Sequence, residues 1–224
     1  MSVSKPVIVA AVFSSVALLA SCGDNAATGN SGERTQYEVE GDHAIGNPDA
    51  AVTVVEYASV TCTHCADWHK AVWPELRKKY VDSGKIRFVY REFPAPASTA
   101  KLAETGFMIA RCADEDKYFA NLSLQYERQG ALLSAAQNGQ AREAYTDLAR
   151  VAGLSEDEFK ACLANDEEYA AMKAVIKGGF ERGVNVTPTF FINGEKTKAF
   201  TLDDFETEFE ERGIEIIAED SKTP

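Results

Sequence analysis

The sequence CTHC at residues 62–65 lies between a segment with strand character and a segment with helix character. The preceding segment VTVVEYA, residues 52–58, is short, apolar and β-branched, which is typical of a buried strand. After the motif, apolar residues recur every four positions and form one stripe of a helix: Trp68, Val72, Leu76 and Tyr80. We therefore expect Cys62 in the first turn of a helix that leaves the end of a strand, with Thr61 as the N-cap.

This position suits a redox-active thiol. The unpaired backbone N–H groups and the dipole at a helix start favour the thiolate. A free thiol titrates at about 8.5, and such a site lowers that pKa to roughly 3.5–7.5. Two other interpretations are half of a zinc site and a purely structural role. Zinc needs four ligands, whereas the chain has no second CxxC and only His43 and His69 as further histidines. The motif therefore favours redox chemistry.

The composition limits the classes of partner. The chain has 224 residues and a formal net charge of −12, which suits one globular unit with an inserted subdomain. A surface this acidic argues against nucleic acid and anionic lipid as partners.

The first 21 residues have the pattern of a secretory leader. Lys5 supplies a positive charge, and residues 7–20 are apolar but too few for a comfortable membrane span. The segment ends in LASC, residues 19–22, which resembles the bacterial lipobox, so we expect cleavage after residue 21 and a lipid anchor on Cys22. An ordinary cleaved signal followed by an accidental cysteine is the alternative. Either form of secretion leads to an oxidising compartment.

The remaining chain divides by composition and periodicity. Residues 22–42 predict a flexible tether with a short edge strand at 37–40, and His43 at its border is also expected to belong to the tether. The alternating segment 86–91 predicts a second strand parallel to the first, and Pro74 should kink the helix between them. Residues 98–183 are helical in pattern, with turn signals at 130–139 and a capping box at Ser155–Glu158.

Strand character returns at the end of the chain. The segment 189–192 predicts a strand, NG at 193–194 a hairpin turn, and 196–200 the returning strand, followed by a helix capped by Thr201 or Asp203. The order predicts an α/β protein, a thioredoxin-like fold with an inserted all-helical subdomain. Its parts are 43–96 and 183–218, the insert is 97–182, and 219–224 is a disordered tail.

Four motifs together resemble the DsbA-like thiol:disulfide oxidoreductases of the bacterial envelope. They are VVEY at 54–57, CTHC at 62–65, REFP at 91–94 and VTPTFFING at 186–194, and the resemblance spans residues 47–213. The family's best-known residues between the cysteines are Pro-His, whereas Thr63 replaces that proline here.

The resemblance implies a division of roles in the motif. Cys62 is the attacking thiol, and Cys65 is turned inward by the helix geometry. A substrate thiolate forms a mixed disulfide at Cys62, and a second substrate thiol then releases the reduced protein. The charge or N–H of His64 would stabilise the Cys62 thiolate. A solvated residue at the helix start is the alternative interpretation of His64.

The second part of the implied site is the segment around Pro188. The matching proline of the family is cis and faces the motif, which would free the Thr187 backbone to pair with an extended substrate segment. Thr187 could also touch the Cys62 sulfur. A trans proline opening a strand is the alternative. Glu56 is implied as a buried acid beneath Cys65 that passes protons, with an outward-facing glutamate as the alternative and Arg91 as a candidate counter-charge.

Two cysteines remain after Cys22 and the motif. We predict that Cys112 and Cys162 form a structural disulfide between two helices of the insert, which would stabilise the fold by about 4 kcal/mol. Two separate buried cysteines are the alternative. Trp68 and Trp73 are predicted core residues, and His69 a surface or half-buried helix residue.

These observations predict an envelope protein-disulfide oxidoreductase that oxidises newly exported, cysteine-containing proteins. It would need no metal and no diffusible cofactor, but it would need a DsbB-like membrane thiol oxidase for reoxidation. A reductase or isomerase on the same fold is the close alternative. A non-catalytic client-binding lipoprotein or holdase is the alternative from another class.

Overall fold

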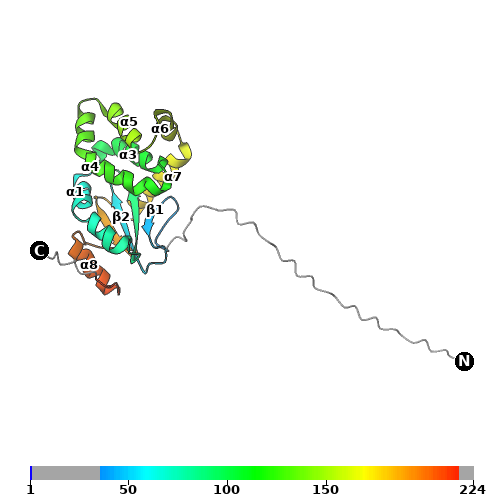
Figure 1. The fold of residues 1–224 in the computed structure, drawn as a ribbon. Helices are drawn as coiled ribbons and strands as arrows, with labels where there is room; N and C mark the ends of the chain where they lie inside the picture. The colour runs from blue at the N-terminus through cyan, green and yellow to red at the C-terminus, as the bar shows by residue number, and fades with distance from the viewer. Residues whose placement is uncertain (2–35, 217–224) are drawn as a thin grey trace. The chain divides into compact units, whose positions relative to one another are not determined.

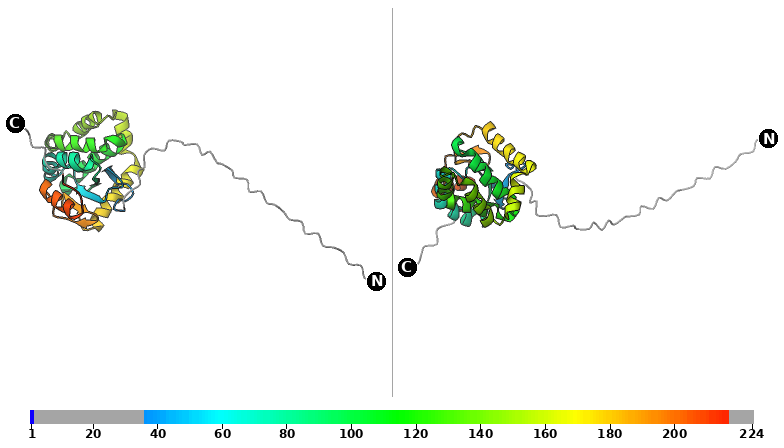
Figure 2. Two further views of the ribbon diagram at one scale, coloured as in Figure 1. Left: turned by 60° about the horizontal axis from the view of Figure 1, so that its bottom comes forward. Right: turned by 90° about the horizontal axis from the view of Figure 1, so that it is seen from above.

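A computed structural model describes Met1 and residues 36–216 of the chain. Within these described residues, five strands form one sheet in the order β1–β3–β2–β4–β5. The helices from α3 to α7 gather at one end of the sheet, and α8 lies towards the other end (Figure 1). The left view of Figure 2 shows the same separation, with the green helices α4 and α5 at the top and the red α8 at the bottom left. The arrangement confirms the predicted α/β class with a helical insert.

The centre of the sheet consists of two parallel strands, β2 (Val52–Ala58) and β3 (Ile86–Glu92). Every residue of β2 is buried, which explains its almost continuous apolar sequence. β1 (His43–Gly46) pairs antiparallel with β3, and β4 (Thr189–Ile192) pairs antiparallel with β2. The carboxyl end of β2 leads directly into the CTHC motif.

The helix predicted after the motif is broken into pieces. α1 (Thr63–Ala71) is followed by α2 (Trp73–Leu76) and by a π-helical turn, Arg77–Val81. Pro74 lies in the first turn of α2, where the missing proline N–H does least harm. The predicted kink is therefore confirmed as a break between α1 and α2.

The start of α1 differs from the prediction. Cys62, not Thr61, is the N-cap residue, and no side chain caps the helix. The Thr61 hydroxyl is instead bound to the hydroxyls of Ser59 at 3.0 Å and Thr99 at 2.9 Å. These tertiary contacts engage the Thr61 hydroxyl oxygen that capping would need. They cannot be predicted from sequence periodicity.

The insert follows β3 and a 3-10 turn, Ala97–Thr99. Its helices are α3 (Ala100–Cys112), α4 (Tyr118–Gln137), α5 (Ala141–Val151), α6 (Glu156–Leu163) and α7 (Asp166–Glu181), with a 3-10 turn, Glu115–Lys117, before α4. The capping box at Ser155–Glu158 is confirmed. The turn expected at 130–139 is wrong for most of its length, because α4 continues through Gly130. A glycine inside a helix costs about 1 kcal/mol, and the buried side chains of α4 outweigh that cost.

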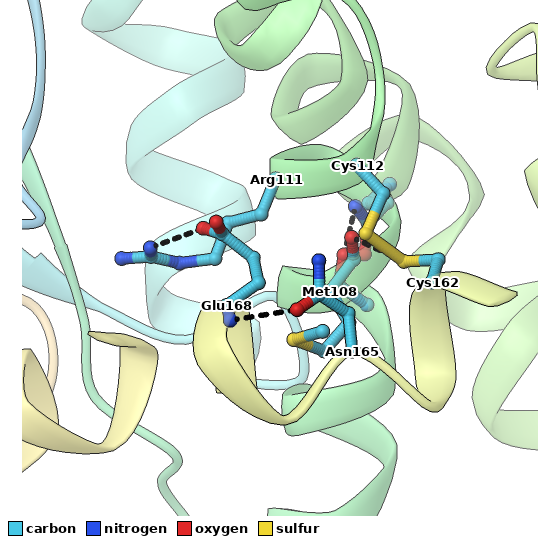
Figure 3. The surroundings of a disulfide bond; sticks show 8 residues. Met108, Arg111, Cys112, Cys162, Asn165 and Glu168 are labelled. Atoms are coloured by element: carbon cyan, nitrogen blue, oxygen red, sulfur yellow. Dashed lines mark hydrogen bonds and ion pairs between the residues drawn. A yellow bond between two sulfur atoms is a disulfide. The ribbon is translucent and has the colours of Figure 1, made fainter. Parts of the chain in front are cut away.

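A disulfide connects two helices of the insert. Cys112 at the end of α3 is bonded to Cys162 in α6, across a sequence separation of 50 residues (Figure 3). Beside it, Arg111 forms ion pairs with Glu92 at 2.7 Å and with Glu168 at 2.8 Å. The bond and these ion pairs fix α3 against α6, α7 and the end of β3.

The C-terminal hairpin follows the predicted turn but is shorter than predicted. Asn193 and Gly194 have φ angles of 47° and 82°, the left-handed values that a type I′ turn requires. After the turn, only the two residues of β5 (Glu195–Lys196) return along β4, so the strand expected at 196–200 is largely absent from the described sheet. Thr201 caps α8 (Leu202–Glu211), as predicted.

Residues 37–42 form turns that pack against the domain. The edge strand predicted at 37–40 is wrong, because Asp42 closes a turn onto Val39 through a backbone bond of 3.2 Å. Asp42 also forms an ion pair with Arg91 at 2.7 Å, so the ordered domain begins before residue 43. His43, expected at the tether, opens β1 and stacks on Tyr118 with ring centroids 3.7 Å apart.

Several predictions fall outside the described residues. These are the leader at 1–21, the lipidated Cys22, most of the tether and the tail at 219–224. In the part of the chain that is described, no helix combines the length and the apolar character that crossing a membrane requires.

Candidate redox site

The two cysteines of the motif occupy different environments at the start of α1. Both thiols are free in this structure. Cys62 is the N-cap residue and is 7% exposed, whereas Cys65, one helical turn later, is completely buried. This places Cys62 at the edge of the core and Cys65 beneath it, as the helix geometry predicts.

The surroundings of Cys62 favour its anion. A hydrogen bond from the Cys65 thiol is the main cause that lowers the pKa of Cys62 from 9.0 to about 5. Burial opposes this shift. A hydrogen bond with the Thr187 side chain and the backbone N–H groups of Cys65 and His64 also lower the pKa of Cys62. As a neutral thiol, Cys62 donates to the carbonyl oxygen of Thr187 at 3.3 Å. Cys62 is therefore ionised at neutral pH.

Cys65 has the opposite electrostatics. Burial raises the pKa of the Cys65 thiol well above its ordinary value. The hydrogen bond it gives to Cys62 and the negative charges of Cys62 and Glu56 raise that pKa further. One thiolate and one thiol thus lie side by side at neutral pH.

The loop before β4 supplies the other wall of the site. The Thr187–Pro188 peptide bond is cis, and the Thr187 carbonyl lies against Cys62. The hydroxyl of Thr189 donates to the Val186 carbonyl at 2.8 Å, which ties the loop to the first residue of β4. The side chain of Val186 is 59% exposed beside this loop. The structure therefore brings Cys62 together with the Thr187–Pro188 segment, which lies more than a hundred residues later in the sequence.

Glu56 is completely buried, and its partner is not the predicted one. Its Oε2 lies 2.9 Å from Nε2 of His69, while its Oε1 has no partner within the described residues. The proposed counter-charge Arg91 is wrong: it pairs with Asp42 and donates to the Tyr57 hydroxyl. Glu56 pairs with Tyr90 across the sheet, and Arg91 is the next residue of β3. Because side chains alternate along a strand, Arg91 and Glu56 point to opposite faces of the sheet.

His69 is the site residue that the sequence analysis missed. It was expected at or near the surface, but it is 7% exposed and its ring stacks on Tyr126 at 4.2 Å. Nδ1 of His69 is buried and has no partner among the described residues. A signal was available, because His69 is four residues after Cys65 and such residues share one face of a helix.

The remaining site predictions concern His64 and metal binding. His64 presents its backbone N–H to Cys62, while its side chain is exposed. A role for the His64 ring stays a prediction. Over the described residues, no three histidine, cysteine or acidic side chains are grouped as a metal ion would require.

The chain matches a known protein family over most of its length. The thioredoxin family model matches residues 38–211. A protein of Rickettsia conorii, provisionally named protein-disulfide oxidoreductase, is 36% identical over 176 residues. The alignment covers 75% of this chain and 59% of the relative, so this chain matches little more than half the length of that protein. A similarly named protein of Rickettsia prowazekii is 36% identical over 171 residues and is covered to 58%.

Solved structures show the same fold at lower sequence identity. α-DsbA1 of Wolbachia pipientis has a TM-score of 0.69 at 23% identity, with 79% of this chain and 93% of that chain covered. Oxidised BdbD of Bacillus subtilis has a TM-score of 0.65 at 19% identity, with 80% and 96% covered. These similarities confirm the thioredoxin-like fold that the four sequence motifs predict.

Proposed function

This chain is a DsbA-like member of the thioredoxin family, and on that premise we propose that it is a protein-disulfide oxidoreductase that oxidises thiols of exported proteins. Its reactive unit is the Cys62–Cys65 pair. The name of the Rickettsia relative and the geometry of the pair both support this activity.

The proposed reaction transfers two electrons from the substrate to this chain. A substrate thiolate attacks Sγ of Cys62 in the Cys62–Cys65 disulfide, forms a mixed disulfide and breaks the bond to Cys65. Cys65 leaves as a thiolate and takes up a proton. A second substrate thiolate then attacks the substrate sulfur of the mixed disulfide and releases Cys62 as a thiolate. The substrate gains a disulfide, and the chain ends with a thiolate and a thiol.

The observation that carries the proposal is the unequal ionisation of the two cysteines. Because the Cys62 thiolate is stabilised, the reduced chain is favoured and its disulfide is an oxidant. The raised pKa of Cys65 makes this thiol protonated when it is displaced from the disulfide. We assign Glu56 the transfer of that proton, since it is buried and its charge acts on Cys65.

The loop at Pro188 is proposed to hold the substrate. The Thr187 carbonyl faces Cys62, so an extended peptide bound along this loop would present its cysteine to the reactive sulfur. The exposed Val186 would add an apolar contact to such a peptide.

We also propose an envelope location and a membrane partner. The leader pattern at 1–21 and the lipobox-like LASC segment support a lipid anchor at Cys22 on the periplasmic side. Each cycle leaves the chain reduced, so a DsbB-like membrane thiol oxidase is the expected electron acceptor.

The test measures turnover and the reduction potential of the purified chain. The oxidised chain should introduce a disulfide into a reduced two-cysteine peptide, and Cys62→Ala should abolish this. Cys65→Ala has no disulfide of its own, so it is mixed with a peptide whose single cysteine is activated as an aryl disulfide; the Cys62 thiolate should displace the aryl thiolate and accumulate as the mixed disulfide with the peptide. A potential near that of thioredoxin, about −270 mV, would favour a reductase and contradict the oxidant role. Unchanged client affinity in Cys62→Ala, without turnover by the unmodified chain, would instead support a holdase.

A further inference from the structure

Helix α4 carries a row of buried amide side chains. Asn121, Gln125 and Gln129 are spaced four residues apart and are each 5% exposed or less. Asparagine and glutamine are mostly exposed in proteins, because a buried amide must find hydrogen-bond partners. A buried row of three on one helix face therefore needs a specific reason.

Gln129 reaches out of the insert to the redox motif. Its Nε2 donates to the carbonyl oxygens of Val60 and Cys62, each at 2.9 Å. These two carbonyls flank the Thr61–Cys62 peptide, immediately before the first turn of α1. The Cys62 carbonyl also accepts the first helical hydrogen bond, from Ala66 at 3.1 Å.

The neighbouring amide on the same face has a different partner. Gln125 donates to the Gly106 carbonyl in α3 at 2.9 Å, and no hydrogen bond connects it to the motif within the described residues. The two glutamines are thus alike in residue type, helix and burial, but only Gln129 contacts the backbone of Cys62.

We propose that Gln129 is a positioning residue of the redox reaction, which holds the backbone of Cys62 in the place where its sulfur meets Thr187 and the N–H groups of α1. This inference rests on the proposed redox activity. A single side chain can do this because a carboxamide has two N–H donors at fixed geometry. One donor on each side of the Thr61–Cys62 peptide restricts both the translation and the rotation of that peptide.

The geometry has a consequence for reactivity. The thiolate of Cys62 is stabilised by groups that a small displacement of its backbone would misplace, namely Cys65, Thr187 and the N–H of His64. Without the two bonds from Gln129, the backbone of Cys62 keeps the bond of its N–H to the Ser59 carbonyl at 3.0 Å, but no side-chain cap fixes the helix start. Loss of Gln129 should therefore weaken the thiolate, and not only the fold.

The test compares Gln129→Met with the matched control Gln125→Met in the full chain. Methionine keeps the length of glutamine and removes its donors. The pKa of Cys62 is measured from the pH dependence of its alkylation rate in the reduced protein. In Gln129→Met the midpoint should rise by about one pH unit, the effect of roughly one lost hydrogen bond to the thiolate. In Gln125→Met the midpoint should not change, although this variant also loses a buried hydrogen bond, the one to the Gly106 carbonyl.

An unchanged midpoint in Gln129→Met, or an equal rise in both variants, would overturn the inference. If Gln129→Met does not fold, the alkylation midpoint of Gln129→Asn is measured instead. The shorter asparagine side chain cannot reach the Val60 and Cys62 carbonyls at the same time, so the midpoint should again rise. The midpoint does not depend on turnover. If the unmodified chain fails to oxidise a peptide, the proposed function fails, and the midpoints still show whether Gln129 positions Cys62.

Discussion

Acidification should destabilise the reduced protein selectively. The thiolate of Cys62 exists only in the reduced form, and its pKa is about 5 in the fold against 9.0 ordinarily. The folded pKa is depressed, so the stabilisation is complete above pH 9 and is lost as the pH falls to 5. At pH 7 the two-unit gap between the pH and the folded pKa corresponds to about 2–3 kcal/mol.

The stabilisation of the Cys62 thiolate also sets the expected change in reduction potential. At pH 7 this stabilisation makes the disulfide more oxidising by about 60 mV than one with an ordinary Cys62. Cys65 adds nothing to the pH dependence below pH 7, because its raised pKa leaves it protonated in the fold and in the unfolded chain.

Denaturant unfolding of both redox forms at pH 7 and pH 4.5 measures the effect. The difference in unfolding free energy between reduced and oxidised protein should change by about 2–3 kcal/mol in favour of the oxidised form at pH 4.5. Comparing the two forms cancels the carboxylates that titrate in both. Reduced Cys62→Ser provides the control without a thiolate. A difference that stays the same at the two pH values would refute the assigned thiolate.

Three further changes have expected outcomes. Replacing Cys112 and Cys162 together by serine should lower the unfolding free energy by about 4 kcal/mol, the chain-entropy effect of a 50-residue loop; a loss below 1 kcal/mol in denaturant unfolding would contradict that role. His69→Phe removes the hydrogen bond to buried Glu56 and should cost about 1–3 kcal/mol. The double variant with Glu56→Leu should lose less than the sum of the single losses, and strict additivity would argue against the pair. Gly106→Ala places a methyl group against the buried side-chain amide oxygen of Gln125 and should cost about 1–3 kcal/mol in thermal or denaturant unfolding; an unchanged stability would show that the Gln125 amide can move away.

The parts of the fold that depend on local pattern could be predicted. The apolar segment 52–58, the proline break after Ala71 and the Asn193–Gly194 turn each carry their own signal, and all three appear in the structure. Gly130 shows the limit of such signals. Glycine favours a turn, but the buried residues of α4 on both sides of Gly130 pack into the core and stabilise the helix.

The site was predictable where a sequence motif carries it, which includes the cis Thr187–Pro188 bond and the contact of Thr187 with the Cys62 sulfur. The spacing of Cys62 and Cys65 indicates a redox pair, whereas the partners of Glu56 and of the Cys62 backbone come from tertiary contacts. His69 could have been found from its helical spacing to Cys65. No local signal identifies Gln129, because its contact with Cys62 spans 67 residues and depends on how α4 docks.

The ion pairs at the N-terminal edge determine where a recombinant fragment must start. Glu38 lies 3.1 Å from Arg87, and Asp42 lies 2.7 Å from Arg91, which is 4% exposed. A fragment trimmed to residue 43 would keep every strand and helix of the described residues but leave the buried guanidinium of Arg91 without the Asp42 carboxylate. Purified material for redox titration, crystallisation or immunisation should therefore begin upstream of Tyr37.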